Sequence, residues 1–322
     1  MVKYKKVLEL CSDVRKGVSS IEGVSINERK SELVEIFSEL MKDYEGNKKE
    51  INAIITENVD IVLESKLQDA LEIFAEIAPV PHGTKKKFRV RSGKIKAEYV
   101  ALGSEIRRQK IYKQEIPAQP RAIGSSVYVE WDDVLSGRAE AFTEIVDEMA
   151  NAILDEILKD VQASFVAAMA DAPTANKYSG AFSLAQLRSV ANTVGAYGKP
   201  VIVGTSVALS NITSDSGFQA LMSDSMKEAF NRDGFIGTWE GKALVQLPNT
   251  FVDESNTEWE LDNNVIFVVP VGSDKPVKIT KEGGTEMLEK QSFEDGSITK
   301  KAIQKAGVNV LQVHNLGMYT IV

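Results

Sequence analysis

The side chains that could perform chemistry in this chain are few and lie far apart in the sequence. It contains two histidines, His82 in an expected loop and His314 in an expected C-terminal strand, and one cysteine, Cys11. Two histidines are too few for a histidine-rich metal site, and one cysteine excludes an internal disulfide and a cysteine-based zinc site. We therefore expect both histidines to be structural residues. We also expect the fold to be stabilised by burial of apolar side chains and not by cross-links. A fold without disulfides suits a reducing cytoplasm.

Glycines near predicted strand ends are the next candidates, because such junctions bind phosphates or carry nucleophiles in α/β enzymes. Residues 203–206 read Val-Gly-Thr-Ser and end a predicted strand, after which we expect a polar loop. They contain neither the GxGxxG pattern of dinucleotide sites nor the lysine of a P-loop, and no GxSxG elbow occurs in the chain. Gly283-Gly284 is interpreted as a turn before a strand, whereas a phosphate loop needs a following helix.

Paired acidic residues are abundant, as at Asp132-Asp133 and Asp155-Glu156. On helix starts and exposed helix faces such pairs usually serve as caps and solvated charge. We therefore predict no catalytic, cofactor-binding or metal-binding residues, and no enzymatic activity.

Composition describes an ordinary globular chain of 322 residues, 43% hydrophobic and 26% charged. No apolar run approaches the roughly 20 residues of a membrane span, and the first six residues lead into a mixed helix and not a signal peptide. The net charge of −8 argues against a protein whose main task is gripping nucleic acid. A protein surface that merely encloses DNA does not need a clustered basic face.

The first 78 residues are predicted to be helical, with a break at Gly46-Asn47 and an end at Pro79-Val80-Pro81. Apolar residues recur at helical spacing. They are Leu33, Ile36, Phe37 and Leu40, then Val59, Val62, Leu63, Leu67, Leu71 and Phe74. These helices need a partner surface, which is either a helical subdomain of the chain or a neighbouring subunit.

Residues 85–131 are predicted to form a long, basic, two-stranded excursion with a turn at Gly103-Ser104. An isolated hairpin is marginally stable in water, so something outside the excursion must cover it. In an oligomer that cover is the next subunit; the alternatives are a hairpin folded on its own domain and a nucleic-acid arm. Glu98, Glu105 and Glu115 interrupt the basic residues and weaken the last alternative.

A long amphipathic helix is predicted from Gly137 to about Asp171, bounded by the possible cap Ser136 and by Pro173. Its length would be on the order of 50 Å, far more than in most globular domains. Its apolar positions drift from strict heptads, which disfavours a coiled-coil dimer. Ile153 is expected on the buried stripe and Asp155 on the exposed face.

The next segment alternates helices with buried strands, a pattern typical of a compact α/β domain. We expect helices at 182–194 and 218–230 and strands at 200–205, 242–247 and 264–271. From Pro276 the chain is strand-like again, with a turn at Asp295-Gly296 and a break at Gly317.

This order of elements resembles the HK97-like major capsid proteins of tailed bacteriophages. The most specific segments are residues 117–121 leading into a strand at 126–131, residues 236–245 leading to Pro248, and the closing segment 308–322, which looks like the final P-domain strand. The resemblance implies an α+β fold with an N-terminal arm (1–84), an E-loop hairpin (85–123), a P-domain (124–180 and 272–322) whose spine helix spans about 137–171, and an A-domain (181–271).

The resemblance also implies the function of a major capsid protein that assembles into hexamers and pentamers of an icosahedral head around double-stranded DNA. Expected partners are further copies of the chain, portal, scaffold or decoration proteins, and packaged DNA held weakly, in a virion assembled in the host cytoplasm. Some relatives cross-link a hairpin lysine to a P-domain asparagine. Lys94 or Lys96 and Asn309 or Asn315 match by region only, and no catalytic glutamate can be placed, so we do not expect this cross-link.

Two alternatives stay open at the level of sequence. An encapsulin-like shell protein would share the fold and hold enzyme cargo, and genes for such cargo beside its own would identify it. A soluble oligomeric α/β enzyme would instead be a defined monomer or dimer with a deep polar pocket.

Overall fold

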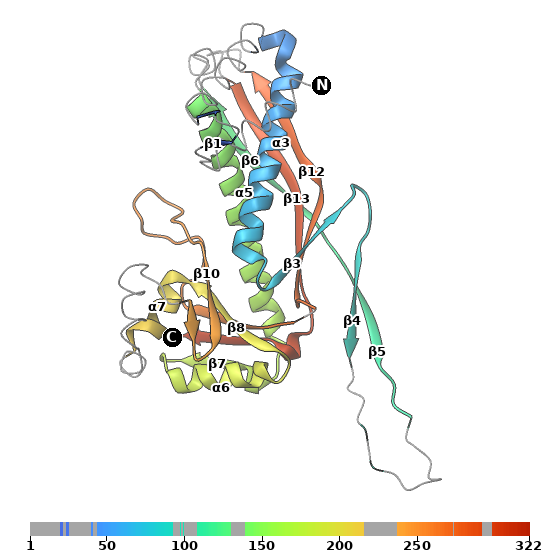
Figure 1. Ribbon diagram of the computed structural model, residues 1–322, viewed down its shortest axis with the longest axis vertical. Coiled ribbons are helices and arrows are strands. Elements are labelled where there is room, and N and C mark those ends of the chain that lie inside the picture. The colour runs from blue at the N-terminus through green and yellow to red at the C-terminus, as the bar shows by residue number, and fades with distance from the viewer. Residues whose placement is uncertain are drawn as a thin grey trace. The chain divides into compact units, whose positions relative to one another are not determined.

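The computed structural model describes residues 20–21, 24–25, 40, 44–92, 97, 99, 108–129, 139–215, 237–272, 274–291 and 298–322. The chain divides into two compact units, and each combines segments that are distant in the sequence (Figure 1). Unit 1 comprises Met1–Ala70, Arg121–Leu158 and Lys281–Ala306. Unit 2 comprises Leu71–Pro120, Lys159–Thr280 and Gly307–Val322.

Helix α3 (Tyr44–Leu71) belongs to unit 1 except for its last residue. Its buried side chains recur at helical spacing, as predicted, and include Ile51, Ile54, Ile55, Val59, Val62, Leu63 and Leu67. The predicted break at Gly46-Asn47 is wrong, because both residues lie in the first turn of α3. Glycine and asparagine are well tolerated there, since the first turn lacks most intrahelical hydrogen bonds.

The start of the chain is not helical throughout. Strands β1 (Ser20–Ile21) and β2 (Val24–Ser25) form a short antiparallel pair. Leu33, Ile36 and Phe37 lie outside the described residues.

Helix α5 (Ala139–Met169) confirms the predicted long helix and passes from unit 1 into unit 2 after Leu158. Its 31 residues make it about 46 Å long. The predicted stripe is buried at Val146, Met149, Ile153, Ile157, Val161 and Phe165. Asp155, which we expected to be exposed, is half-buried.

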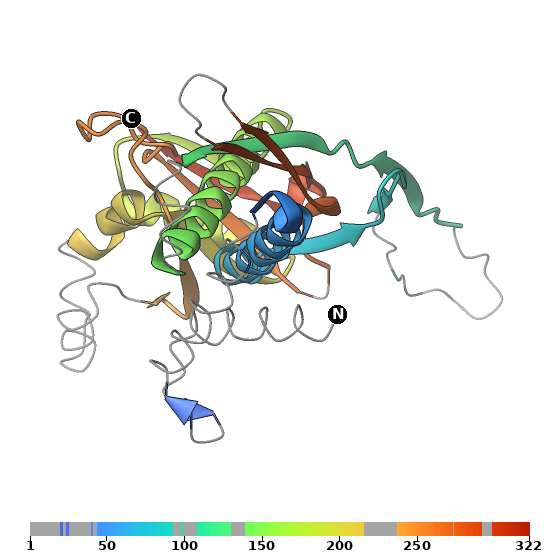
Figure 2. The same cartoon turned by 90° about the horizontal axis from the view of Figure 1, so that it is seen from above.

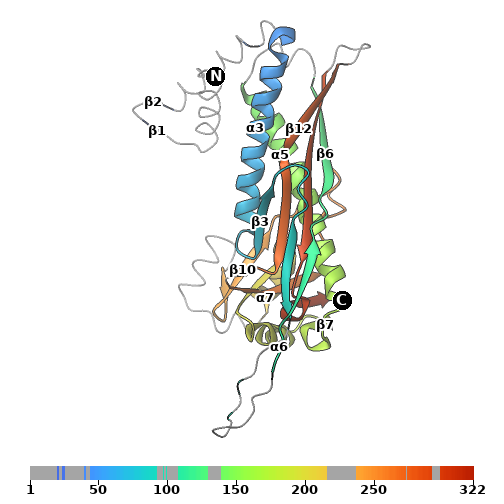
Figure 3. The same cartoon turned by 90° about the vertical axis from the view of Figure 1, so that its right-hand side faces the viewer.

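A four-stranded sheet has the order β3-β12-β13-β6. Its strands are β3 (Ala75–Val80), β6 (Arg121–Val129), β12 (Val277–Gln291) and β13 (Ile298–Val310). β13 and β6 pair antiparallel from Ile298 opposite Val129 to Ala306 opposite Arg121. In unit 1, α3 and α5 run lengthwise beside β12 and β6 (Figure 3).

Strand β3 was missed by the sequence analysis, which extended the preceding helix to residue 78. The helix ends at Leu71, and Pro79 lies within the strand. Proline cannot donate to a ladder and is tolerated on edge strands, and β3 is at the edge of its sheet. The same prolines that end a helix therefore fit this strand.

The turn predicted at Gly283-Gly284 is also wrong, because β12 continues through both residues. Gly283 has φ 67, and a Cβ on Gly284 would lie 2.9 Å from Asp60 Oδ2 of α3. The Asp60 carboxylate accepts hydrogen bonds from the backbone N–H of Thr285 and, at 2.6 Å, from its hydroxyl. Glycine here lets a helix carboxylate approach the strand closely.

A six-stranded sheet in unit 2 has the order β7-β14-β11-β8-β10-β9. Its strands are β7 (Lys177–Gly180), β8 (Lys199–Thr205), β9 (Thr238–Trp239), β10 (Lys242–Leu247), β11 (Val265–Val271) and β14 (Gly317–Ile321). β8 pairs parallel with β10 and antiparallel with β11. The strands predicted at 200–205, 242–247 and 264–271 are confirmed.

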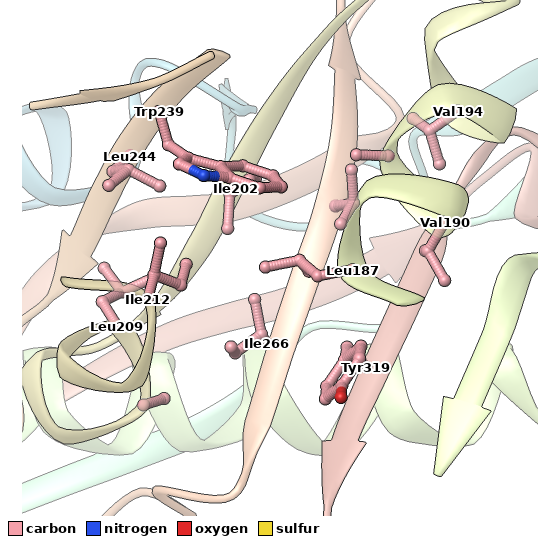
Figure 4. Packing of buried hydrophobic residues seen from close by; sticks show 13 residues of the cluster. Leu187, Val190, Val194, Ile202, Leu209, Ile212, Trp239, Leu244, Ile266 and Tyr319 are labelled. Carbon is pink, nitrogen blue, oxygen red and sulfur yellow. The ribbon is translucent and has the colours of Figure 1, made fainter. Parts of the chain in front are cut away.

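Helices α6 (Leu184–Gly195) and α7 (Ser206–Ser214) pack on this sheet. Their apolar side chains and those of the strands form one cluster (Figure 4), which includes Leu187, Val190, Val194, Ile202, Leu209, Ile212, Trp239, Leu244, Ile266 and Tyr319. α6 confirms the helix predicted at 182–194. The helix predicted at 218–230 and the turns at Gly103-Ser104 and Asp295-Gly296 lie outside the described residues.

Helix α7 stands where the sequence analysis expected a polar loop. Thr205 ends β8 and caps the helix, since its hydroxyl accepts a hydrogen bond from Ala208 N at 3.3 Å. Ala208 and Leu209 are buried, as is Ile212 one turn later. In the sequence, polar residues interrupt this short apolar pattern. The capping residue, Thr205, is of a type that is also common in loops.

The closing segment contributes to both sheets, whereas we expected a single P-domain-like strand. It supplies the end of β13, the 3₁₀ turn η2 (Val313–Asn315) and β14. His314 therefore lies in η2 and not in a strand. Gln312 has φ 55, a left-handed conformation that interrupts extended structure before η2.

Candidate assembly surface

The most unusual described surface is the hairpin formed by β4 (Lys87–Ser92) and β5 (Tyr112–Pro117). The strands pair antiparallel from Lys87 opposite Pro117 to Ser92 opposite Tyr112. No third strand joins this pair in the part of the chain that the structure describes. The hairpin projects from the rest of unit 2 (Figure 1).

Among the described residues of the hairpin, only those at its base are covered by the rest of the chain. Phe88 packs in a small buried cluster with Ala78 and Leu311. Ala118 N donates to Lys86 O at 2.9 Å and closes the strands at this end. Farther out, residues 112–115 are all exposed, and Tyr112 retains 63% of its accessible surface.

The hairpin is also strongly basic. Residues 85–116 contain eleven Lys and Arg and three Glu, a net charge of +8 in a chain whose net charge is −8. Glu115 Oε2 lies 3.3 Å from Lys87 Nζ, and its Oε1 lies 3.4 Å from Arg89 Nε. The hydrogen bond and charge of Lys87, then those of Arg89, hold the pKa of Glu115 below its usual range. These exposed ion pairs use one of the three Glu of the segment, whose net charge stays at +8.

The residues first considered for chemistry are not brought together. His82 lies in the turn before the hairpin, His314 in η2, and Thr205 caps α7. Among the described residues no group of three His, Cys, Asp or Glu could hold a metal ion. No described helix is both long and apolar enough to cross a membrane.

The residues considered for a cross-link are only partly described. Asn309 Nδ2 donates to Pro117 O at 3.4 Å at the hairpin base, and Asn315 Nδ2 donates to Gln312 Oε1 at 3.0 Å. Lys94 and Lys96 lie outside the described residues, as do Asp132 and Asp133.

A buried polar cluster in unit 1 escaped the sequence analysis. Lys300 retains 3% exposure and donates to Asn52 Oδ1 at 3.0 Å, while Asn52 Nδ2 donates to Glu289 Oε2 at 2.8 Å. Lys48 Nζ lies 3.0 Å from Glu289 Oε1. Burial lowers the pKa of Lys300 to about 8, an effect that Glu289 opposes and Lys48 reinforces. Charged side chains on a predicted strand and helix normally indicate exposed faces, so no sequence signal identified this cluster.

The fold is that of HK97-like phage major capsid proteins. It is similar to the capsid of the cyanophage P-SCSP1u, with a TM-score of 0.51 and 13% identity over 78% of this chain and 87% of that chain. It is also similar to a structure from Microbacterium phage Oxtober96, with a TM-score of 0.55 and 11% identity over 79% of this chain and 90% of that one. The α+β capsid fold implied by the sequence resemblance is therefore confirmed.

Sequence comparison is more specific. The chain belongs to the family described as "SPbeta prophage-derived putative capsid protein YonB", which matches residues 6–320. A relative from Bacillus subtilis strain 168, the SPbeta prophage-derived protein YonB, is 27% identical over 282 residues, covering 84% of this chain and 83% of the relative. The chain is thus a structural capsid protein of phage type, and neither alternative is favoured.

Proposed function

We propose that this chain is the shell-forming subunit that assembles as hexamers and pentamers into an icosahedral phage head around double-stranded DNA. The observation that carries the proposal is the β4–β5 hairpin, because its described side chains beyond the base are exposed. Two strands alone are marginally stable in water. Cover from neighbouring copies stabilises the hairpin and joins subunits through many individually modest contacts.

We assign the regions of the chain by the same reasoning. Residues 1–84 form the N-terminal arm, 85–123 the E-loop, 124–180 and 272–322 the P-domain with α5 as its spine, and 181–271 the A-domain. Maturation of the shell would then move packed elements of the subunit as rigid bodies, as in other assemblies with two stable states.

The acidic balance of the chain suits an enclosing role. Outside residues 85–116 the net charge is −16, since the whole chain carries −8 and this segment +8. DNA packed against such a surface is held weakly and stays mobile for packing and ejection. Portal, scaffold or decoration proteins are the other expected partners, in a virion assembled in the host cytoplasm, and the chain itself has no intrinsic catalytic activity.

Sedimentation and negative-stain microscopy of the purified protein test this proposal together. We expect species far above 35.3 kDa that increase with concentration and form rings or shells. Duplex DNA at physiological salt should leave the gel mobility unchanged at micromolar protein. A strictly monomeric protein, or tight DNA binding with a steep salt dependence, would contradict the proposal.

A further inference from the structure

The loop between β10 and β11 combines acidic charge with exposed apolar side chains. Residues 249–262 contain five Asp and Glu and no Lys, Arg or His. Phe251 and Trp259 face each other across a β-bridge, with ring centroids 3.8 Å apart, and retain 36% and 38% exposure. Val252 beside them retains 55%. Contiguous exposed apolar side chains with a polar rim are typical of interaction sites.

Internal hydrogen bonds hold the tip of this loop in one conformation. Val252 N donates to Glu258 O at 2.8 Å, which continues the hairpin beyond the aromatic pair. The Asp253 carboxylate accepts from Thr257 N at 2.9 Å and Glu258 N at 3.0 Å, and also from the hydroxyls of Ser255 and Thr257. These bonds hold the pKa of Asp253 far below its usual range, so its charge persists in mildly acidic solution.

The base of the loop is fixed to α5 within unit 2. Lys159 Nζ lies 2.6 Å from Glu260 Oε1, and Gln162 exchanges two hydrogen bonds with the backbone of Asp262, at 3.0 and 2.8 Å. A surface held in this way loses little conformational entropy when it binds. Asp253 and Glu260 serve these internal contacts, whereas Glu254 and Glu258 are exposed.

The same chain carries a second surface that also combines exposed apolar side chains with charge, but its charge is opposite to that of the 249–262 loop. The described outer part of the β4–β5 hairpin exposes Lys110 and Lys113 beside Ile111 and Tyr112. Both surfaces therefore combine apolar side chains with charge, positive on the hairpin and negative on the loop. Such complementarity favours this pairing over contacts between two hairpins or two loops.

The two surfaces project from opposite sides of unit 2. In Figures 1 and 2 the loop between β10 and β11 lies on the left and the β4–β5 hairpin on the right. Complementary surfaces on opposite sides of one body pair head to tail, and such heterologous contacts form rings when the rotation closes.

We infer that the 249–262 loop is the docking site for the basic β4–β5 hairpin of a second copy of this chain. Phe251, Val252 and Trp259 would pack against Ile111 and Tyr112, with Glu254 and Glu258 facing the hairpin lysines. The inference rests on the proposed shell function and adds to it the surface on which the hairpin lies.

Charge reversal tests the docking and leaves the hydrogen bonds and ion pairs described above for either surface intact. K110E also removes Lys110 Nζ, which lies 5.5 Å from the centroid of the Tyr112 ring. E254K/E258K reverses the loop, and K110E/K113E reverses the hairpin. Each double variant should raise the protein concentration for half-assembly at least about tenfold. The two combined in one chain should recover most of the assembly, because opposite charges face each other again.

The control pair is E72K/D171K, which changes the net charge as much as E254K/E258K does but alters exposed acids outside the loop. It should assemble like wild type, and all variants should unfold at the wild-type temperature. Loop or hairpin reversals that assemble normally, a combined variant that does not recover, or a control that fails equally would each overturn the docking alone. Wild-type protein that stays monomeric would overturn the shell function and the docking together.

Tryptophan fluorescence gives an independent readout. Of the three tryptophans, Trp131 lies outside the described residues, Trp239 is buried within its own chain, and Trp259 is partly exposed and should become covered in the shell. W259F keeps Trp131, Trp239 and an aromatic ring against Phe251, so assembly should shift the emission of wild type to shorter wavelength by more than it shifts that of W259F. An emission shift on assembly that is equal in wild type and W259F would contradict the docking.

Discussion

The six-stranded sheet and the β4–β5 hairpin both belong to unit 2, but they are stabilised in different ways. The strand β11 is buried at six consecutive residues and covered by helices of its own chain. The strand β5 has exposed side chains at its first four residues. The sheet therefore contains its own core, whereas the proposed function has the outer hairpin covered by surfaces outside the monomer. The contrast separates what folds the subunit from what assembles it.

The largest difference should follow from placing a charge in each region. Ile202 in β8 is fully buried, so I202D leaves a carboxylate without a partner in the core and should cost more than about 4 kcal/mol of unfolding free energy. Y112D on the hairpin should change it by less than about 0.5 kcal/mol but weaken assembly. Urea unfolding, at protein concentrations too low for assembly, measures the unfolding free energy of both variants. Equal losses would show that the hairpin belongs to the core of the monomer.

Adding a single methyl group to the six-stranded sheet should lower the free energy of unfolding by an intermediate amount. A Cβ on Gly317 of β14 would lie 2.7 Å from Val190 Cγ1 and 3.0 Å from Val194 Cγ2 of α6. Valine cannot easily move aside, so G317A should cost about 1–3 kcal/mol. V190A in the same chain removes the nearer methyl, and a double-mutant cycle should give a favourable coupling. Additive losses would show that the strand and helix are less closely packed.

A smaller effect should distinguish two buried lysines whose pKa values are shifted in opposite directions, and it depends on pH. Burial lowers the pKa of Lys300 to about 8 in the folded protein. Between pH 8 and about 10.5 the unfolded chain holds this proton and the folded chain loses it, so stability rises with pH across that range. The burial penalty is fully present below pH 8. The free energy of unfolding of wild type minus that of K300M should therefore increase from pH 8 to 10, by at most about 1.4 kcal/mol per pH unit.

Lys278 is the matched control for this measurement. Burial alone would lower its pKa, but hydrogen bonds to Asp274 and Glu76 outweigh burial and raise it. A lysine whose pKa is raised contributes constant stability below its unfolded pKa and loses it only above. The difference between wild type and K278M should stay flat from pH 7 to 9.5. A flat difference for K300M as well would contradict the lowered pKa of Lys300.

The same contrast explains what the sequence revealed. β8, β10, β11 and the stripe of α5 were predictable because long apolar patterns record burial within the chain. α7 and β3 were missed because Thr205 and Pro79 are also typical of loops and helix ends. These ambiguities were resolved by tertiary contacts: the apolar face of α7 on the sheet and the edge position of β3.

The assembly surfaces were only partly predictable. The basic hairpin was recognisable as an excursion that needs a cover, because its charge and alternation are local. The 249–262 loop was not, since its aromatic pair becomes visible only when Phe251 and Trp259 are brought together by the bridge. The buried cluster around Lys300 was hidden because its members come from α3, β12 and β13.

The most direct test of the account is to shorten the hairpin. Ser92 faces Tyr112, so replacing residues 93–111 with Asn-Gly closes the strands by a turn that hairpins favour. We predict a monomer that keeps its cooperative thermal transition within about 2 °C of wild type and sediments at every concentration as a single chain of slightly less than the 35.3 kDa of the full-length protein. Shells formed by this variant, or loss of its cooperative transition, would contradict the claim that the hairpin serves assembly and not the fold.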